Sequence, residues 1–237
     1  MTITPALHVK NEEYWIAYVL RNVLGVFGCA IMIDTGSTDR TVDIARAIAE
    51  RTGADLTLVC EDMQNDPEQI GRCSTRLREM VTTPWMLLVD GDEIYSAAAL
   101  ETMLRTVPDP EKYDVGMVNG RNLMLVNEIS LAEREGFAAD RLFSKNVSWD
   151  MRTDYPFQSH DLEARCRSGR VSYFSFEEVY FWHTRHLVRS SKDEDAFFRT
   201  EKIDYFAADG GPRGLPDGWL GSVESEWPNP YLNGGAA

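Results

Sequence analysis

The sequence has few cysteines, few basic residues and no long apolar run, and each shortage argues against a class of protein. Its four cysteines lack the spacing of zinc or redox motifs, so they are typical of small core residues in a reducing compartment. Basic residues number 24 against 38 acidic ones, and the net charge of -14 argues against nucleic-acid binding through a basic surface. A phosphorylated ligand remains compatible with this charge, provided that the site supplies a local cation.

Membrane insertion and secretion also find no support in the sequence. No run of about 18 apolar residues occurs, so we expect no membrane span. The N-terminal residues lack the charged start, apolar run and small-residue cleavage site of a signal peptide. We therefore expect a cytoplasmic location, with peripheral attachment to a membrane as the alternative that stays open.

The first half of the chain alternates between strand and helix patterns. With 43% hydrophobic and 11% aromatic residues, the 237-residue chain can bury the core of a large domain. Apolar spacing predicts strands at residues 3–9, 29–33, 56–59 and 85–89. It predicts helices from an Asn11 N-cap to a stop at Gly25, at 41–51, from Pro67 to Val81, and at 97–107. This alternation predicts βαβ units and a parallel sheet.

After Asp114 the alternation fades. Short strands are predicted at residues 115–118, 123–126, 141–143, 171–176 and 179–182. One more helix is predicted at 193–206, followed by a Gly- and Pro-rich tail of loose order from residue 210 onward. We expect one domain over residues 1–237, divided into a nucleotide-type half (1–113), a more irregular half (114–190), and a C-terminal helix and tail (191–237).

The most informative stretch is residues 85–93, where an apolar run leads directly into three carboxylates. Such a run is typical of a strand buried on both faces, and ligands bind outside the carboxyl ends of such strands. Residues i and i+2 of an extended chain point the same way, so Asp90 and Asp92 can converge. Gly91 between them lets a ligand approach the backbone. Two hard oxygen ligands suit Mg²⁺ or Mn²⁺ carrying phosphates, whereas the structural alternative is a polar turn after a core strand.

Asp34 follows the strand at 29–33 as Asp90 follows the strand at 85–89, and three interpretations compete for it. The apolar-D-T-G pattern occurs in aspartic proteases, but their chemistry needs two such aspartates and the chain has one copy. A second interpretation is a turn that caps the following helix. The third is a carboxylate at a strand end that binds a sugar or a base.

Asp90-Gly91-Asp92 resembles the D-x-D of haloacid-dehalogenase phosphatases, in which the first aspartate is a nucleophile. In that family the motif closes the first strand, whereas several βα units precede it here. The combination of three blocks is more specific. Asn11-Glu12-Glu13, residues 34–41 and residues 85–93 together resemble the family 2 glycosyltransferases with a GT-A fold, over about residues 3–110.

This resemblance implies a GT-A-like (Rossmann-like) α/β fold with a mostly parallel central sheet flanked by helices. It implies a nucleotide-diphosphate sugar donor of the UDP or GDP type, Mn²⁺ or Mg²⁺, and inversion at the anomeric carbon. Asp34 would bind the nucleoside, Asp90 the ribose and the metal, and Asp92 the metal directly. The donor-binding residues implied by the three blocks and by the helix before the D-x-D strand are Asn11, Glu12, Asp34, Gly36, Arg72, Arg76 and Asp90.

The second half resembles bacterial lipopolysaccharide-core-type members of the family. The residues that carry this resemblance are Arg141-Leu142-Phe143, Trp149, His160-Asp161 and Trp182-His183, with Asp161 in place of a glutamate. An inverting transfer needs a base for the acceptor hydroxyl, and Asp161 is the first candidate and His160 the second. His183 is placed like the late histidine that completes the metal site.

Arg185 lies in the most basic stretch and is a candidate for gripping the pyrophosphate. For each residue of the second half the structural alternative stays open: ordinary loop residues, a half-buried histidine, or a solvated helix start.

The sequence therefore predicts a glycosyltransferase that acts on a hydroxyl of a glycan, of a lipid-linked molecule or of a small molecule. Two alternatives from other classes stay open. One is a domain that binds a nucleotide sugar or a glycan without catalysis. The other is a hydrolase of the D-x-D phosphatase type.

Overall fold

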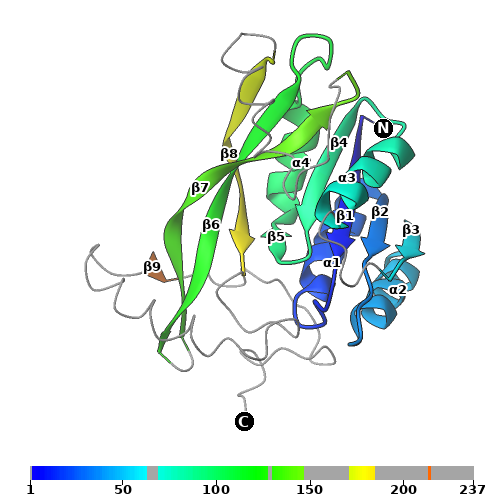
Figure 1. Cartoon of the computed structure of the whole chain (residues 1–237). Coiled ribbons are helices and arrows are strands. Elements are labelled where there is room, and N and C mark those ends of the chain that lie inside the picture. The colour runs from blue at the N-terminus through cyan, green and yellow to red at the C-terminus, as the bar shows by residue number, and fades with distance from the viewer. Residues whose placement is uncertain (1, 63–68, 128–129, 147–170, 185–212, 215–237) are drawn as a thin grey trace.

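A computed structural model describes residues 2–62, 69–127, 130–146, 171–184 and 213–214 (Figure 1). The helices are α1 (Ile16–Phe27), α2 (Thr41–Thr52), α3 (Gln69–Met80) and α4 (Ala97–Thr106). The strands are β1 (Ile3–Val9), β2 (Cys29–Asp34), β3 (Asp55–Cys60), β4 (Trp85–Asp90), β5 (Glu93–Tyr95), β6 (Val115–Asn127), β7 (Ser130–Ser144), β8 (Tyr173–His183) and β9 (Arg213–Gly214). Within these residues the strands form one sheet in the order β3-β2-β1-β4-β7-β6-β8-β5, with β9 paired to β7.

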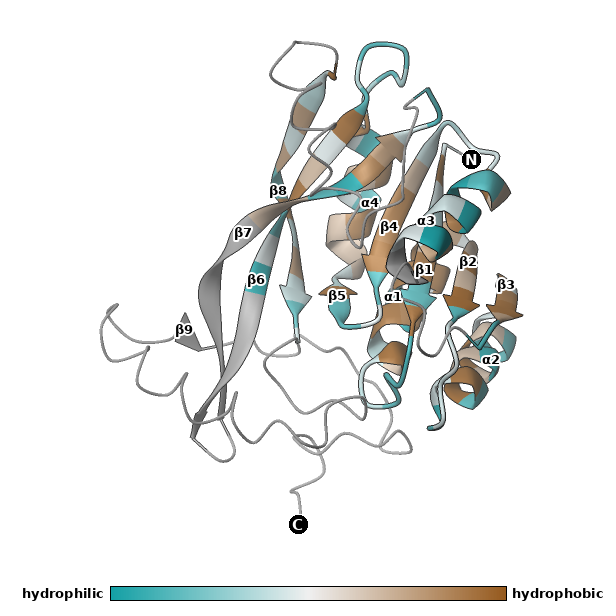
Figure 2. Cartoon of the chain, viewed as in Figure 1, coloured by the Kyte–Doolittle hydropathy of each residue, from teal (hydrophilic) through white to brown (hydrophobic). Residues whose placement is uncertain are grey.

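The first half of the sheet is parallel, as predicted. Strand β1 pairs in parallel with both β2 and β4, and β2 pairs in parallel with β3. Strand β4 is buried along residues 85–89, and its side chains alternate between two cores. Leu87 and Val89 pack in the larger core with residues of α1, α2 and α4, whereas Met86 and Leu88 pack with Leu77 of α3 on the opposite face. Figure 2 shows this apolar centre as brown strands between the helices.

Burial of these strands on both faces is the main source of their stability. Each fully buried Leu or Val side chain stabilises the fold by roughly 1.5–3 kcal/mol relative to an exposed one. A continuous apolar run is consistent with such a position, because no face of the strand meets solvent. The helices on the two faces therefore fix where the polar ends of the strands lie.

Helix α1 begins and ends later than predicted. Asn11 does not cap it, since the helix starts at Ile16 and Asn11 has a positive φ of 53° in the preceding loop. Gly25 lies inside the helix, and the left-handed residue that ends it is Gly28, at a φ of 70°. The Gly28 N–H donates to the Leu24 carbonyl, which completes the helix C-terminus.

The second half contains longer strands than predicted. The two strands expected at 115–118 and 123–126 are one strand, β6, and the segment expected at 141–143 is the end of the fifteen-residue strand β7. The strands expected at 171–176 and 179–182 are joined in β8, and β5 was not predicted. Cross-strand hydrogen bonds in the β6–β7 hairpin extend both strands past the stretches with apolar spacing.

Other expectations for the second half are only partly covered by the described residues. The helix predicted at 193–206 lies outside them, and the predicted tail contains β9. The division of the chain into residues 1–113, 114–190 and 191–237 stays a prediction. Among the described helices, none combines the length and the apolar character needed to cross a bilayer.

Candidate active site

Three parallel strands end at the same edge of the sheet, and polar side chains gather there. The register places Val9 beside Asp34 and His8 beside Asp90, so the carboxyl ends of β1, β2 and β4 are level. Ligands of open α/β sheets bind outside this edge. The two aspartates that the sequence singled out therefore lie at the place where this kind of fold binds its ligands.

One carboxylate oxygen of Asp34 closes a turn, and the other has no hydrogen-bond partner in the described part of the chain. Its Oδ1 accepts hydrogen bonds from the N–H groups of Gly36 (3.2 Å) and Ser37 (3.0 Å). Its Oδ2 is buried and has no hydrogen-bond partner among the described residues, although Asp34 is only 2% exposed. A buried polar atom without a partner is costly, so this oxygen is suited to a donor group of a ligand. The turn and the ligand-binding interpretations of Asp34 are thus compatible.

Replacement of Gly36 in this turn by any other residue would strain the backbone. Its φ is +102°, a conformation that side chains disfavour, and an added Cβ would lie 3.1 Å from Asp62 Oδ1. The predicted role of Gly36 in donor binding stays a prediction. Its observed role is to let the backbone fold around the Asp34 carboxylate.

The loops after β1 and β2 are joined by hydrogen bonds between side chains and backbone. Asn11 N–H donates to Ser37 Oγ (2.8 Å), and Asn11 Oδ1 accepts from Thr38 N–H (2.8 Å). Glu12 N–H donates to Thr41 Oγ1 (2.7 Å) at the start of α2. The first two sequence blocks therefore form one structural unit. The predicted contacts of Asn11 and Glu12 with a donor stay predictions beside this observed role.

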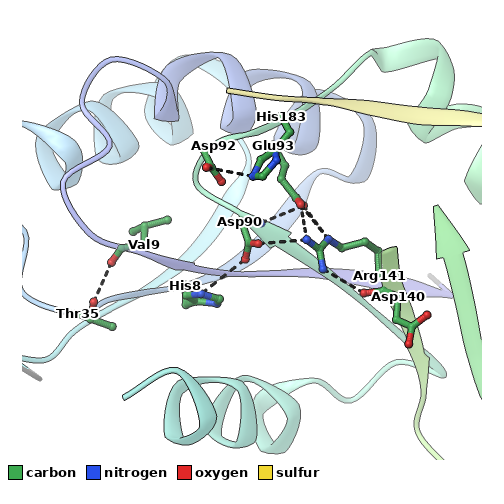
Figure 3. A network of polar contacts seen from close by, with 9 residues as sticks. All are labelled: His8, Val9, Thr35, Asp90, Asp92, Glu93, Asp140, Arg141 and His183. Atoms are coloured by element: carbon green, nitrogen blue, oxygen red, sulfur yellow. Dashed lines mark hydrogen bonds and ion pairs between the residues drawn. The ribbon is translucent and has the colours of Figure 1, made fainter. Parts of the chain in front are cut away.

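The turn between β4 and β5 carries three carboxylates, and two of them bind Arg141 of β7 (Figure 3). Arg141 Nε donates to both oxygens of Glu93, at 3.0 and 2.9 Å, and Nη2 makes a further short contact with Glu93 Oε1. Nη2 also lies 3.2 Å from Asp90 Oδ2. Asp90 Oδ1 lies 3.6 Å from His8 Nε2, so both oxygens of Asp90 face cationic or imidazole groups of the protein.

Arg141 and Glu93 are buried, with exposed fractions of 6% and 0%. Burial by itself lowers the pKa of Arg141, but the negative charges of Glu93 and Asp90 outweigh it and raise that pKa above its ordinary value. The guanidinium is therefore a permanent positive charge inside the cluster. Such a cation offsets part of the repulsion among neighbouring carboxylates.

The side chain of Asp92 contacts the side chain of His183, which ends β8. Asp92 Oδ2 is 3.3 Å from His183 Nε2, and both residues are buried. Two observations fix this pairing: Glu93 lies opposite His183 in the β5–β8 ladder, and Thr184 N–H donates to the Asp92 carbonyl (2.9 Å). Burial lowers the pKa of His183, but the hydrogen bond and charge of Asp92 outweigh it, so the pKa is raised overall.

The Asp92–His183 pair fits a divalent metal that arrives with part of its own coordination shell. A carboxylate oxygen and an imidazole nitrogen suit Mn²⁺, and Mg²⁺ is often held by one or two carboxylates plus substrate phosphates. The described residues contain no group of three or more His, Cys, Asp or Glu arranged to hold a metal ion. Of the three predicted metal ligands, Asp92 and His183 are in side-chain contact. The carboxylate oxygens of the third, Asp90, instead face Arg141 and His8.

Of the two predicted basic residues in α3, both of which are exposed, Arg76 has a contact beside the site edge. Arg76 forms an ion pair with Glu61, which follows β3, and Glu61 N–H donates to the Asp34 carbonyl (2.8 Å). Arg72, one turn earlier, is exposed. A contact of either arginine with a donor stays a prediction.

The remaining predicted site residues, His160, Asp161 and Arg185, lie outside the described residues. Sequence reasoning missed two buried members of the site, Arg141 and Glu93. Both carried a signal, because a charged residue in an otherwise apolar strand, and a third acid after a D-x-D, each need a partner when buried.

Comparison with known proteins bears on the family and the fold of the chain. The family model for glycosyl transferase family 2 matches residues 7–181. Over 95 residues the chain is 32% identical to the SPbeta prophage-derived glycosyltransferase SunS of Bacillus subtilis (strain 168), a match that covers 40% of this chain and 21% of that protein. The chain thus spans about a fifth of this curated relative.

Two solved structures share the fold at low sequence identity. TarS 1-349 of S. aureus, in complex with UDP-GlcNAc, is 12% identical with a TM-score of 0.57, over 81% of this chain and 61% of that chain. The mannosyltransferase PcManGT from Pyrobaculum calidifontis, in complex with GDP-Man and Mn²⁺, is 14% identical with a TM-score of 0.55, over 77% of this chain and 56% of that chain. The mixed α/β fold of the GT-A type is thereby confirmed, and the chain belongs to glycosyl transferase family 2.

Proposed function

We propose that this chain transfers a sugar from a nucleotide-diphosphate donor to a hydroxyl acceptor, with the help of a divalent metal. One observation carries the proposal. The same sheet edge holds the buried Asp34 Oδ2, which lacks a donor within the described structure, and the buried Asp92–His183 pair. The buried Asp34 oxygen suits a nucleoside, and the Asp92–His183 pair suits a metal that binds phosphates. A nucleotide sugar contains both a nucleoside and phosphates.

The donor would bind with its nucleoside at Asp34 and its diphosphate at the D-x-D turn. Asp34 Oδ2 can accept a hydrogen bond from an N–H of the base or an O–H of the ribose. The relatives support a UDP- or GDP-linked sugar, because TarS was solved with UDP-GlcNAc and PcManGT with GDP-Man. Asp90 would lie toward the ribose. Arg72, Arg76 and Arg185 are the proposed cations for the diphosphate.

Asp92 and His183 would hold Mn²⁺ or Mg²⁺, with Asp90 close by. The presence of Mn²⁺ in the PcManGT complex supports the use of a divalent metal. The metal would act as a Lewis acid that stabilises the charge of the leaving nucleoside diphosphate. The protein residues contribute the orientation: Arg141 fixes Asp90 and Glu93, and Thr184 fixes the backbone at Asp92.

The base for the acceptor hydroxyl would be Asp161, with His160 as the second candidate. Proton removal by such a base contributes roughly 10²–10⁴-fold to the rate, and direct attack by the acceptor would invert the anomeric carbon. The acceptor would be a hydroxyl of a glycan, of a lipid-linked molecule or of a small molecule. Location in the cytoplasm, with or without attachment to a membrane surface, is part of the same proposal.

A thermal-shift screen of nucleotide sugars with and without Mn²⁺ tests the proposal, because a ligand that binds only the folded state raises the melting temperature. We expect a UDP- or GDP-sugar to raise it more with Mn²⁺ than without. No shift with any nucleotide sugar, with or without metal, would overturn the proposal.

A binding domain without activity would give the thermal shift but release no nucleoside diphosphate with any acceptor. A phosphatase would instead release inorganic phosphate from a generic phosphate ester. Coupled assays for the nucleoside diphosphate and for phosphate separate these outcomes.

A further inference from the structure

Arg141 binds two carboxylates of the D-x-D turn and is not itself one of the predicted ligands of donor or metal. We propose that Arg141 is a positioning residue: it holds Glu93 and Asp90 so that Asp92, which lies between them in the chain, faces His183. This inference rests on the proposed function. It assigns a role in metal-dependent nucleotide binding to a residue of the second half of the sheet.

The backbone of β7 is irregular at this residue. Leu142 pairs with Gly116 of β6 and Asp140 pairs with Met117, so Arg141 has no partner of its own in the ladder. Such a β-bulge re-aims a side chain and often occurs next to an active site. The Arg141 guanidinium also lies 5.5 Å from the ring centroid of Phe181 in β8, and its Nη1 donates to the Asp140 carbonyl (3.2 Å). The bulge, the ring and the carbonyl together define where the guanidinium sits.

The contacts of Arg141 constrain the turn on both sides of Asp92. On one side, Nη2 reaches Asp90 Oδ2 at 3.2 Å. On the other, Arg141 binds both oxygens of Glu93, and Glu93 in turn lies opposite His183 in the β5–β8 ladder. Asp90 N–H also donates to Glu93 Oε2 (3.3 Å), which closes the turn internally. Release of Arg141 would therefore leave the side chains on both sides of Asp92, those of Asp90 and Glu93, without their shared partner (Figure 3).

The chemistry of the contact requires arginine rather than any cation. A guanidinium presents several N–H groups in a fixed plane and can serve two carboxylates at once, whereas an ammonium is a point charge on a flexible stem. Lysine at this position would preserve the charge and lose the geometry. Arg141→Lys therefore separates positioning from simple charge balance.

The experiment measures the affinity of the whole chain for UDP and for GDP by calorimetry, each with and without Mn²⁺. We expect Arg141→Lys to weaken Mn²⁺-dependent binding by about 10–100-fold, the range found when the partner of a metal ligand is removed. Binding without metal, which depends on Asp34, should change less than threefold. Arg105→Lys is the matched control, because Arg105 lies on α4 and is 66% exposed.

The inference is overturned if the Arg141→Lys variant binds nucleotide in the presence of Mn²⁺ with an affinity within twofold of that of the unmodified chain, whatever the melting temperature of the variant. If Arg141→Lys does not fold, Glu93→Gln carries the test, since it removes the charge that Arg141 binds and keeps the shape. Unchanged Mn²⁺-dependent affinity in Glu93→Gln would then overturn the inference. If the unmodified chain binds neither nucleotide with Mn²⁺, the proposed function itself fails, which is a distinct result.

Discussion

Asp92 Oδ2 and His183 Nε2 lie 3.3 Å apart, although the two residues are separated by much of the second half of the chain. The antiparallel pairing of β5 with β8 makes this contact, and the Thr184 N–H bond to the Asp92 carbonyl holds it. A carboxylate and an imidazole in this arrangement can share a proton or a metal, but two protein ligands alone bind a metal weakly. Under the proposed function, we therefore expect metal binding to depend on a bound nucleotide.

Asp92→Asn should remove the metal-dependent part of nucleotide binding. The substitution keeps the size of the side chain and loses the charge, so we expect at least a tenfold loss of affinity for UDP or GDP in the presence of Mn²⁺. Calorimetry with and without Mn²⁺ checks this. Asp43→Asn is the control, since Asp43 lies on α2 and is 80% exposed. Equal Mn²⁺-dependent affinity in Asp92→Asn and in the control would contradict the assignment.

Asp34→Asn should weaken nucleotide binding whether or not metal is present. The amide oxygen of Asn can still accept from the N–H groups of Gly36 and Ser37, so the turn and the melting temperature should persist. The amide nitrogen would then occupy the place of Oδ2 and present a donor where an acceptor stood. We expect at least tenfold weaker binding of UDP or GDP in calorimetry. A large fall in the melting temperature with unchanged affinity would instead make Asp34 purely structural.

Gly91→Ala should destabilise the protein. An added Cβ would lie 2.7 Å from Glu12 Cγ and 3.1 Å from Val9 Cγ1, so the loop after β1 would have to shift. We expect a loss of about 1–3 kcal/mol in the free energy of unfolding, as is usual for overpacking. Urea denaturation measures it.

Gly25→Ala is the matched control for this substitution. Gly25 lies inside α1, and an added Cβ would have nothing within 4 Å. It should stabilise the protein by roughly 0.5–1 kcal/mol, the usual gain from replacing a helical glycine by alanine. A neutral Gly91→Ala would show that the contact between Glu12 and the D-x-D turn is loose.

Asp140→Asn should stabilise the protein, and more so at neutral than at acidic pH. Burial raises the pKa of Asp140 to about 6, and the charge of Arg141 only partly opposes this. An acid with a raised pKa in the folded state contributes stability below its unfolded pKa and loses it as the pH rises through the folded value. At pH 7.5 the ionised carboxylate is therefore unfavourable, by about 1 kcal/mol after allowance for solvent screening.

The check is the free energy of unfolding of both proteins at pH 5 and pH 7.5. The advantage of Asp140→Asn should be clear at pH 7.5 and shrink at pH 5, as the native carboxyl takes up its proton. Asp43→Asn, at an exposed position on α2, is the control variant measured in parallel. An advantage that is equal at both pH values would contradict the assignment of the effect to Asp140.

Local patterns were sufficient to predict the parallel half of the sheet. They were also sufficient to predict that three acidic residues, Asp34, Asp90 and Asp92, lie where its strands end. Apolar runs of strand length are typical of strands buried between helices, and the carboxyl ends of parallel strands share one edge, so Asp34 and Asp90 were expected at the same edge of the sheet. In the structure they lie there on either side of β1. The start of α1 was not predictable in this way. The Asn11 side chain bonds Thr38, 27 residues away, and so is unavailable as a helix cap.

The amino-acid sequence by itself thus determined the βαβ core, the family and the place of the carboxylates, because these depend on periodicities within one segment. Only the tertiary structure decided which groups meet those carboxylates. Arg141 contacts Glu93 across 48 residues, through a bulge that no local pattern encodes. The lengths of β6 and β7 and the existence of β5 likewise depend on pairing between strands, whose free energy comes from the partner as much as from the strand itself.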